Sequence, residues 1–189
     1  MTPAWCNGSV MRFSPWFVLG FAVLLTTALE AQQPLDLPNP GFEEEFTGWV
    51  VSNQDNGMSK ASAEAARNGQ AGLRVEDRDS EFGSSLFSGA VPAEAGKKYA
   101  VKFWARNLEG EGLGVYLIFF DSQGRYLNKQ ELKNENIVSV PKGARDWEQF
   151  TVEGVAPDEA ASLKIWIHSF TKNHVSADVD DFSVLEITE

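Results

Sequence analysis

The sequence predicts an all-β fold, an antiparallel two-sheet β-sandwich (jelly roll), preceded by a signal peptide. Short runs of alternating β-branched and aromatic residues recur along the chain, separated by Gly, Pro, Asn and Asp, and these are the signals of strands and turns. Amphipathic helical patterns are nearly absent. Many short strands at near-regular spacing are typical of an antiparallel sandwich rather than of a βαβ fold.

Residues 1–31 are predicted to be a secretory signal peptide. A single base, Arg12, precedes the apolar run 13–29, and small residues follow as far as Ala31, which is the pattern of a cleaved leader. An N-terminal membrane anchor is the alternative, but about 17 apolar residues are at or below the usual spanning length. We therefore expect a secreted, extracytoplasmic protein (periplasmic or extracellular) whose folded domain spans residues 32–189.

The composition narrows the classes of partner. The chain has 16 basic and 27 acidic residues, a net charge of −11, and removal of Arg12 and Glu30 with the leader leaves that charge unchanged. A chain this acidic is not attracted to nucleic acid or to an anionic membrane surface, so neither is expected as a partner. The only cysteine, Cys6, lies in the leader, so the domain must be stabilised by its core without disulfides.

In the first half of the domain the strand signals are short. Residues 73–76 and 84–91 are predicted strands. The segment 59–67 is rich in alanine and is followed by Asn68-Gly69, a typical helix C-terminus. The sequence therefore predicts a turn of helix there.

The clearest strand is residues 98–106. By the two-residue period of a strand, its core-type residues share one face and its polar and tryptophan residues share the other. The first face is Tyr99, Val101, Phe103 and Ala105, and the second is Lys102, Trp104 and Arg106. The next strand, 114–120, is followed by a turn at 121–124 and by residues 125–127, so a hairpin is predicted.

Three further strands are predicted at residues 147–152, 163–170 and 179–187. A turn at Val155-Ala156-Pro157 joins the first two. The strand 163–170 alternates in the same way as 98–106. One face carries Leu163, Ile165 and Ile167, and the other carries Lys164, Trp166 and His168.

A series of motifs extends along the domain in a fixed order. These are Asn39-Pro40-Gly41-Phe42-Glu43, Gly48-Trp49, the Gly-containing turn and strand 68–75, the strand 99–106, Trp147-Glu148-Gln149-Phe150, and the final strand 179–184. The ordered set resembles the carbohydrate-binding modules of the family 4, 9 and 22 type. The resemblance implies a galactose-binding-domain-like jelly roll that commonly accompanies a glycoside hydrolase. Here the module would either act alone or have its catalytic partner on another polypeptide.

The same resemblance implies one structural calcium ion. Its ligands would be the Glu43 carboxylate, a backbone carbonyl near Arg67 or Asn68, and a carboxylate from Asp180 or Asp181. A hard cation requires several oxygen ligands, and this set would join the first and last strands. The alternative is that these acids are solvated residues at strand ends.

Tryptophan is the residue type that a sugar site would use, because aromatic rings stack on pyranose faces while planar polar groups bond the hydroxyls. Outside the leader these are Trp49, Trp104, Trp147 and Trp166. We expect Trp49 and Trp147 to lie in the core or at a sheet edge. Trp104 and Trp166 each point away from the core face of their strand.

We therefore expect one cleft on a single concave sheet. Its predicted ligand-binding residues are Trp104, Trp166, Lys102, Arg106, His168 and Tyr116, with Phe120 as an alternative to Tyr116. The basic and histidine side chains would bond hydroxyls. The alternatives are a reversed register or a loop that covers the tryptophans.

Catalysis finds little support in the sequence. There is no Gly-x-Ser-x-Gly or His-Glu-x-x-His motif, and His168 and His174 have a poor spacing for a metal. We therefore predict non-catalytic binding of a poly- or oligosaccharide. The alternatives are a structural or adhesive cell-envelope domain of the same fold without a sugar site, and a small glycan hydrolase or an accessory to one. The expected partners are carbohydrate and a glycoside hydrolase or an envelope protein.

Overall fold

The computed structural model describes Met1 and residues 31–127, 136–170 and 172–188. The predicted signal peptide lies almost wholly outside the described residues and stays a prediction. Within the described residues, no helix has the length and apolar character needed to cross a membrane.

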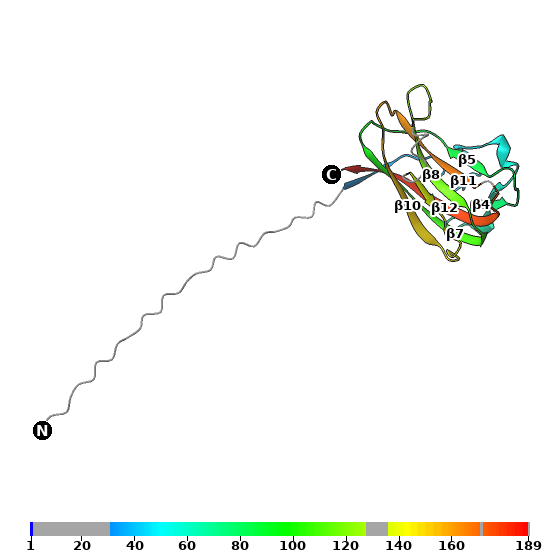
Figure 1. The fold of residues 1–189 in the computed structure, drawn as a ribbon, viewed down its shortest axis with the longest axis horizontal. Coiled ribbons are helices and arrows are strands. Elements are labelled where there is room, and N and C mark those ends of the chain that lie inside the picture. Colours follow the sequence, from blue (N-terminus) through cyan, green and yellow to red (C-terminus); the bar gives the residue numbers. More distant parts are fainter. Residues whose placement is uncertain (2–30, 128–135, 171, 189) are drawn as a thin grey trace.

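Two antiparallel sheets form a sandwich (Figure 1). Sheet A has the strand order β10-β7-β12-β4-β3, and β1 pairs with the end of β12. Its strands are β1 Ala31–Leu35, β3 Ser59–Ser62, β4 Gly72–Asp77, β7 Lys98–Gly110, β10 Glu148–Val155 and β12 Val175–Thr188.

Sheet B has the strand order β2-β5-β11-β8-β9, and the short β6 pairs with β11. Its strands are β2 Trp49–Val51, β5 Ser85–Ser88, β6 Val91–Pro92, β8 Leu113–Phe120, β9 Ile137–Ser139 and β11 Ser162–Ser169. Two short 3-10 turns, η1 Asn53–Asp55 and η2 Ala63–Ala65, lie in the connections. The predicted all-β two-sheet sandwich is confirmed.

The core lies between the inner faces of the two sheets, and the predicted alternation places its residues there. On β7, Tyr99, Val101, Phe103 and Ala105 are at most 1% exposed, and on β11 Leu163, Ile165 and Ile167 are fully buried. Burial of large apolar side chains such as these is the main favourable contribution to folding. The opposite faces of the same strands are only half-buried, so they form the two outer surfaces of the sandwich.

The last strand, β12, ties the start of the domain to its end. Its register against β7 shifts between Asp180 and Ser183, and Asp181 has a φ of 52°. The Phe182 N–H, at this bulge, donates to the Pro40 carbonyl at 3.0 Å. The Phe182 ring then packs against the ring of Phe42 in the core, so the Asn-Pro-Gly-Phe motif is fixed on β12.

Two local predictions hold only in part. In the segment 59–67 the predicted turn of helix is limited to the 3-10 turn η2, because Ser59–Ser62 form β3 and pair with β4. The predicted hairpin after β8 is present as a turn at 121–124 and an antiparallel bridge between Phe120 and Tyr126, but residues 125–127 form no strand, and β9 also pairs with β8. As predicted, a turn after Val155 leads from β10 to β11; the two strands lie in different sheets, so this turn crosses the sandwich.

Candidate functional site

The two predicted site tryptophans lie on opposite outer surfaces. Trp104 is on β7 in sheet A, whereas Trp166 is on β11 in sheet B. The single cleft that the sequence predicted is therefore wrong, since strand alternation tells which side of its own sheet a residue takes but not which sheet. The structure separates Lys102, Trp104 and Arg106 on sheet A from Tyr116, Trp166 and His168 on sheet B.

The Trp104 ring is covered by a cation of its own chain. The guanidinium of Arg67 lies 3.6 Å from the Trp104 ring centroid, a cation–π contact. Arg67 is held there by an ion pair of 2.8 Å with Asp181. The neighbouring Lys102 donates to the Gln32 side chain of β1 at 2.9 Å.

Arg106 on the same surface belongs to a buried ion-pair network. The fully buried Asp178 accepts from Arg106 at 2.8 Å and from Arg74 at 2.8 and 3.1 Å. The Asp178 contact is the main reason why the pKa of Arg74 is raised. Arg106 also lies over Trp147, at 4.9 Å from the ring centroid. The outer face of sheet A is thus occupied by internal contacts.

The other two tryptophans lie where the sequence predicted. Trp49 is 6% exposed and belongs to the core, with its ring 4.8 Å from that of Phe42. Trp147 is half-buried beside β10, at an edge of sheet A.

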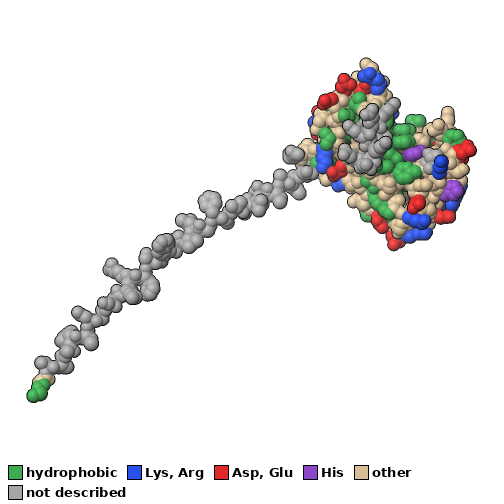
Figure 2. Space-filling view, viewed as in Figure 1, with side chains coloured by type: hydrophobic (Ala, Val, Ile, Leu, Met, Phe, Trp, Pro, Cys, Tyr) green, Lys and Arg blue, Asp and Glu red, His purple; other side chains and the backbone are tan. Residues whose placement is uncertain are grey.

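Sheet B carries a cluster of aromatic rings around Trp166. Phe87 on β5 lies parallel to it, with centroids 5.4 Å apart and planes 2° apart. Tyr116, directly opposite on β8, lies at 4.7 Å, and His168 on the same strand lies at 4.5 Å. We call the outward side of sheet B around these four rings the aromatic face. Figure 2 shows hydrophobic side chains gathered over the region where Figure 1 labels β5, β8 and β11, with a histidine beside them.

A groove of about 370 Å³ lies on the aromatic face. Its lining residues are Phe87, Ile118, Phe120, Tyr126, Lys164 and Trp166. One wall is the pair Phe87–Trp166, and the other is the pair Phe120–Tyr126, whose centroids are 5.7 Å apart. Since Phe120 pairs with Ser162, four residues before Trp166 on β11, the walls stand about 13 Å apart along the strands.

The floor between these walls is formed by a cross-strand pair. Lys164 on β11 is opposite Ile118 on β8. Ile118 is 2% exposed, and the Lys164 ammonium lies 5.2 Å from the Phe120 ring centroid. The groove is therefore apolar at its base and sides, with a single charged group.

Hydrogen bonds fix the polar edges of the aromatic face. The Trp166 Nε1–H donates to the Ser85 hydroxyl at 3.0 Å. The His168 Nδ1 faces the Ser84 carbonyl, which can only accept, so Nδ1 carries the proton and Nε2 is the acceptor. Burial lowers the pKa of His168, which favours the neutral ring. Burial also raises the pKa of Tyr116 to about 12, so its hydroxyl stays protonated.

Sequence reasoning missed Phe87, Ile118 and Tyr126 as lining residues. Phe87 alternates with the core residue Leu86 on a four-residue strand, and this alternation was the available signal. Its stacking on Trp166 depends on the pairing of β5 with β11, strands nearly eighty residues apart in sequence. A single sequence gives no signal from which the pairing of β5 with β11 could be predicted.

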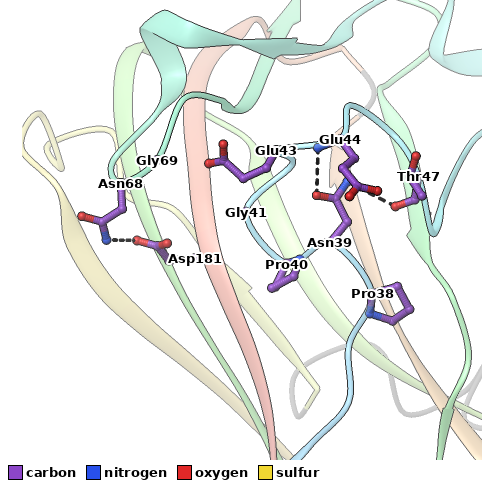
Figure 3. A pocket seen from close by; sticks show the side chains of 10 residues that line it. All are labelled: Pro38, Asn39, Pro40, Gly41, Glu43, Glu44, Thr47, Asn68, Gly69 and Asp181. Carbon is purple, nitrogen blue, oxygen red and sulfur yellow. Dashed lines mark hydrogen bonds between the residues drawn. The ribbon is translucent and has the colours of Figure 1, made fainter.

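The residues expected at a metal site lie together only in part. A Cβ on Gly41 would be 3.3 Å from Asp180 Oδ1 and 3.8 Å from Glu43 Oε1, so these two carboxylates flank Gly41. Figure 3 shows Glu43 extending toward the turn that carries Asn68 and Gly69. Asp181 instead bonds the Asn68 side chain at 2.6 Å and pairs with Arg67, away from this position.

Backbone N–H groups bond both carboxylates. Glu43 accepts from Gln70 N at 2.9 Å, and the fully buried Asp180 accepts from Arg67 N at 2.7 Å and from Asn68 N at 3.3 Å. Burial raises the pKa of Asp180, against the effect of those N–H groups. Among the described residues, no three Asp, Glu, His or Cys side chains are grouped so as to hold a metal ion. A cation here would therefore need backbone oxygens as well.

Comparisons with known proteins place the fold. No protein-family model matches the chain, and no curated protein matches it. Among solved structures it is similar to a Family 16 carbohydrate-binding module (18% identity, TM-score 0.57), with 78% of this chain and 97% of that chain covered. It is also similar to the CBM22-1 xylan-binding domain of Paenibacillus barcinonensis Xyn10C (18% identity, TM-score 0.56; 86% and 99% covered).

A third similar structure is an enzyme, the Stig cyclase Fisc from Fischerella sp. TAU in complex with an indole-containing compound. It is 16% identical with a TM-score of 0.60, and the match covers 84% of this chain and all of that one. Identities this low show the fold alone. The chain has the two-sheet β-sandwich fold that carbohydrate-binding modules share with this cyclase.

Proposed function

We propose that this protein binds a poly- or oligosaccharide without catalysis, through the groove on the aromatic face of sheet B. The observation that carries the proposal is the apolar groove between the Phe87–Trp166 and Phe120–Tyr126 pairs. Aromatic walls suit the C–H faces of pyranose rings, and Lys164 on the groove floor can bond hydroxyls. The similarity to modules of families 16 and 22 supports a kinship with the wider group that includes families 4, 9 and 22.

The test is a glycan array with residues 32–189, followed by affinity electrophoresis on the polysaccharides that are retained. Trp166→Ala should weaken binding roughly 30-fold, the equivalent of about 2 kcal/mol for an aromatic anchor. Trp104→Ala is the matched control, because its ring lies on the opposite sheet beneath Arg67. If both variants bind as the wild type does, or both fail alike while folded, the groove is the wrong site.

The same experiment separates the rival functions. A folded domain that binds no glycan favours the structural or adhesive envelope role. The likeness to a cyclase makes an enzyme the second candidate, and a small molecule transformed at the groove would support it. Release of reducing ends from a retained polysaccharide would support the glycan hydrolase.

We further propose that a calcium ion binds beside Gly41, held by the Glu43 and Asp180 carboxylates with backbone oxygens. The fit is supported by Asp180, a fully buried carboxylate that no ion pair engages among the described residues and whose hydrogen bonds come from backbone N–H groups. Asn68 would contribute through its backbone. The ion would supply positive charge that stabilises the junction of the first and last strands.

Calcium should raise the melting temperature of the wild type, and chelator should reverse the rise. Asp180→Asn should remove this response, whereas Asp181→Asn should keep it, because Asp181 is directed to Arg67. If neither calcium nor chelator changes the melting temperature of the wild type, the calcium site is ruled out.

We also propose export through the predicted leader, which places the domain where extracellular or periplasmic glycans are found, with a glycoside hydrolase or envelope protein as its protein partner. Cell fractionation with mass spectrometry of the N-terminus would show whether the chain begins after Ala31.

A further inference from the structure

Acidic residues are distributed unequally between the two sheets. None of the six described strands of sheet B contains Asp or Glu, and their only Lys or Arg is Lys164. In sheet A, β4, β7, β10 and β12 all contain acids. In a chain of net charge −11, the described strands of sheet B therefore place no carboxylate on their outward side.

Among the described residues, Lys164 on β11 has no anionic partner. It stands on the floor of the groove opposite Ile118, between the two aromatic walls. Within the described part of the chain, no hydrogen bond or ion pair engages its ammonium, and its one polar contact is with the Phe120 ring. Elsewhere most bases are ion-paired, namely Lys60, Arg67, Arg74, Arg78, Lys97, Lys98, Arg106 and Arg125.

Such a lysine suits an anion better than a neutral hydroxyl. A hydrogen bond from an ammonium to an ionised oxygen is about twice as strong as one between neutral groups. The apolar walls formed by Trp166 and Phe120 lower the effective dielectric, which strengthens the attraction further. The absence of carboxylates from the strands around Lys164 removes the repulsion that an anionic ligand would otherwise meet at short range.

We propose that the groove takes an acidic saccharide, with its anionic group at the Lys164 ammonium and its ring against Trp166. This inference rests on the proposed function and names the class of its ligand. A carboxylate, as in a uronic acid, and a sulfate ester share the required chemistry. Because the protein is acidic as a whole, preference for an anion must come from this local contact, since long-range attraction is lacking.

The test compares matched polymers that differ in charge. Polygalacturonate is paired with its methyl-esterified form, and dextran sulfate is paired with dextran, so that carboxylate and sulfate are examined separately. The proteins are the wild type, Lys164→Gln, Lys164→Arg and Trp166→Ala. Lys142→Gln is the matched control, because Lys142 is an exposed lysine outside the groove.

The wild type should bind at least one charged polymer more tightly than its neutral partner. Lys164→Gln should weaken that binding on the order of tenfold, as expected for loss of a charge-assisted contact, and should weaken binding of the neutral polymers much less. Lys164→Arg should retain most of the preference, and Lys142→Gln should behave as the wild type.

Two outcomes would overturn the inference. If charged and neutral polymers bind equally and Lys164→Gln has no effect, while Trp166→Ala abolishes binding, the ligand is a neutral saccharide and the proposed function stands. If the folded wild type binds none of these polymers and no glycan on the array, the proposed function fails together with the inference.

Discussion

The rings of Trp166 and Phe87 lie parallel across the β11–β5 pair, with planes 2° apart and centroids 5.4 Å apart. At that distance parallel rings are offset-stacked, so each restrains the other. Ser85, two residues before Phe87 on β5, accepts the hydrogen bond of the Trp166 indole. Trp166 is thus held at two points by β5 before any ligand binds, and such preorganisation reduces the entropic cost of binding.

Removal of the stacking partner should weaken glycan binding without removing the anchor. Phe87→Ala deletes part of one groove wall and frees the Trp166 ring, so we expect a loss of roughly three- to tenfold, smaller than that of Trp166→Ala. Phe82→Ala is the control, because Phe82 is 48% exposed and does not line the groove. If affinity electrophoresis gives Phe87→Ala and Phe82→Ala the same glycan affinity, Phe87 plays no part in binding.

Trp104 should affect stability rather than binding. Its ring carries the Arg67 guanidinium, and Trp104→Ala would remove this contact and part of the outer surface of sheet A. We expect the free energy of unfolding in urea to fall by about 1–3 kcal/mol, with glycan affinity unchanged. If the folded Trp104→Ala variant loses glycan affinity, Trp104 belongs to the binding site.

Asp178 should be one of the most sensitive polar residues. It is fully buried and is the shared partner of Arg74 and Arg106, so Asp178→Asn would leave Arg106 without its ion pair and Arg74 with only the exposed Glu64. We expect a loss of about 3 kcal/mol or more in unfolding free energy. The control is Glu64→Gln, since the exposed Glu64 bonds the same Arg74 and exposed pairs contribute little. If Asp178→Asn and Glu64→Gln lower the unfolding free energy equally, the buried ion pairs of Asp178 do not stabilise the fold as described.

His168 should make the domain less stable in mild acid. Burial lowers its pKa in the folded state, although the Ser84 carbonyl and Asp77 act in the opposite direction. The unfolded chain therefore takes up a proton more readily, and stability falls as the pH drops below about 6.5 toward the folded-state pKa. Urea unfolding at several pH values should show a smaller decline for His168→Gln than for the wild type.

The other histidine supplies the control for that measurement. His174 is exposed, and His174→Gln should keep the decline that His168→Gln reduces. If the two variants show the same dependence on pH as the wild type, the burial of His168 does not control stability in this range.

The sequence predicted the faces of single strands well. On β7 and β11 the alternation alone separated core residues such as Phe103 and Ile165 from outward residues such as Trp104 and Trp166. The alternation did not predict which sheet each strand joins, because strand pairings distant in sequence decide this. The groove depends on β5, β8 and β11 together, so of its wall residues the sequence predicted only Trp166, with Phe120 as an alternative to Tyr116.

In the segment 59–67 a local helical preference is realised only in part, as the 3-10 turn η2. Its alanines favour a helix, yet Ser59 and Ala61 pair with β4, and the Ser62 hydroxyl accepts from Glu64 N to begin η2. Tertiary pairing with β4 outweighs a propensity of a few tenths of a kcal/mol per residue.

The pairing of β1 with the end of β12 has a mechanical consequence. Ala31 lies opposite Thr188, and Leu35 lies opposite Val184, so a pull that separates the two chain ends acts across the strands, along their hydrogen bonds. Bonds loaded in this way break one after another instead of sharing the load. Tension should therefore peel β1 away at low force, beginning at its N-terminal end, while the sandwich that carries the aromatic face stays folded.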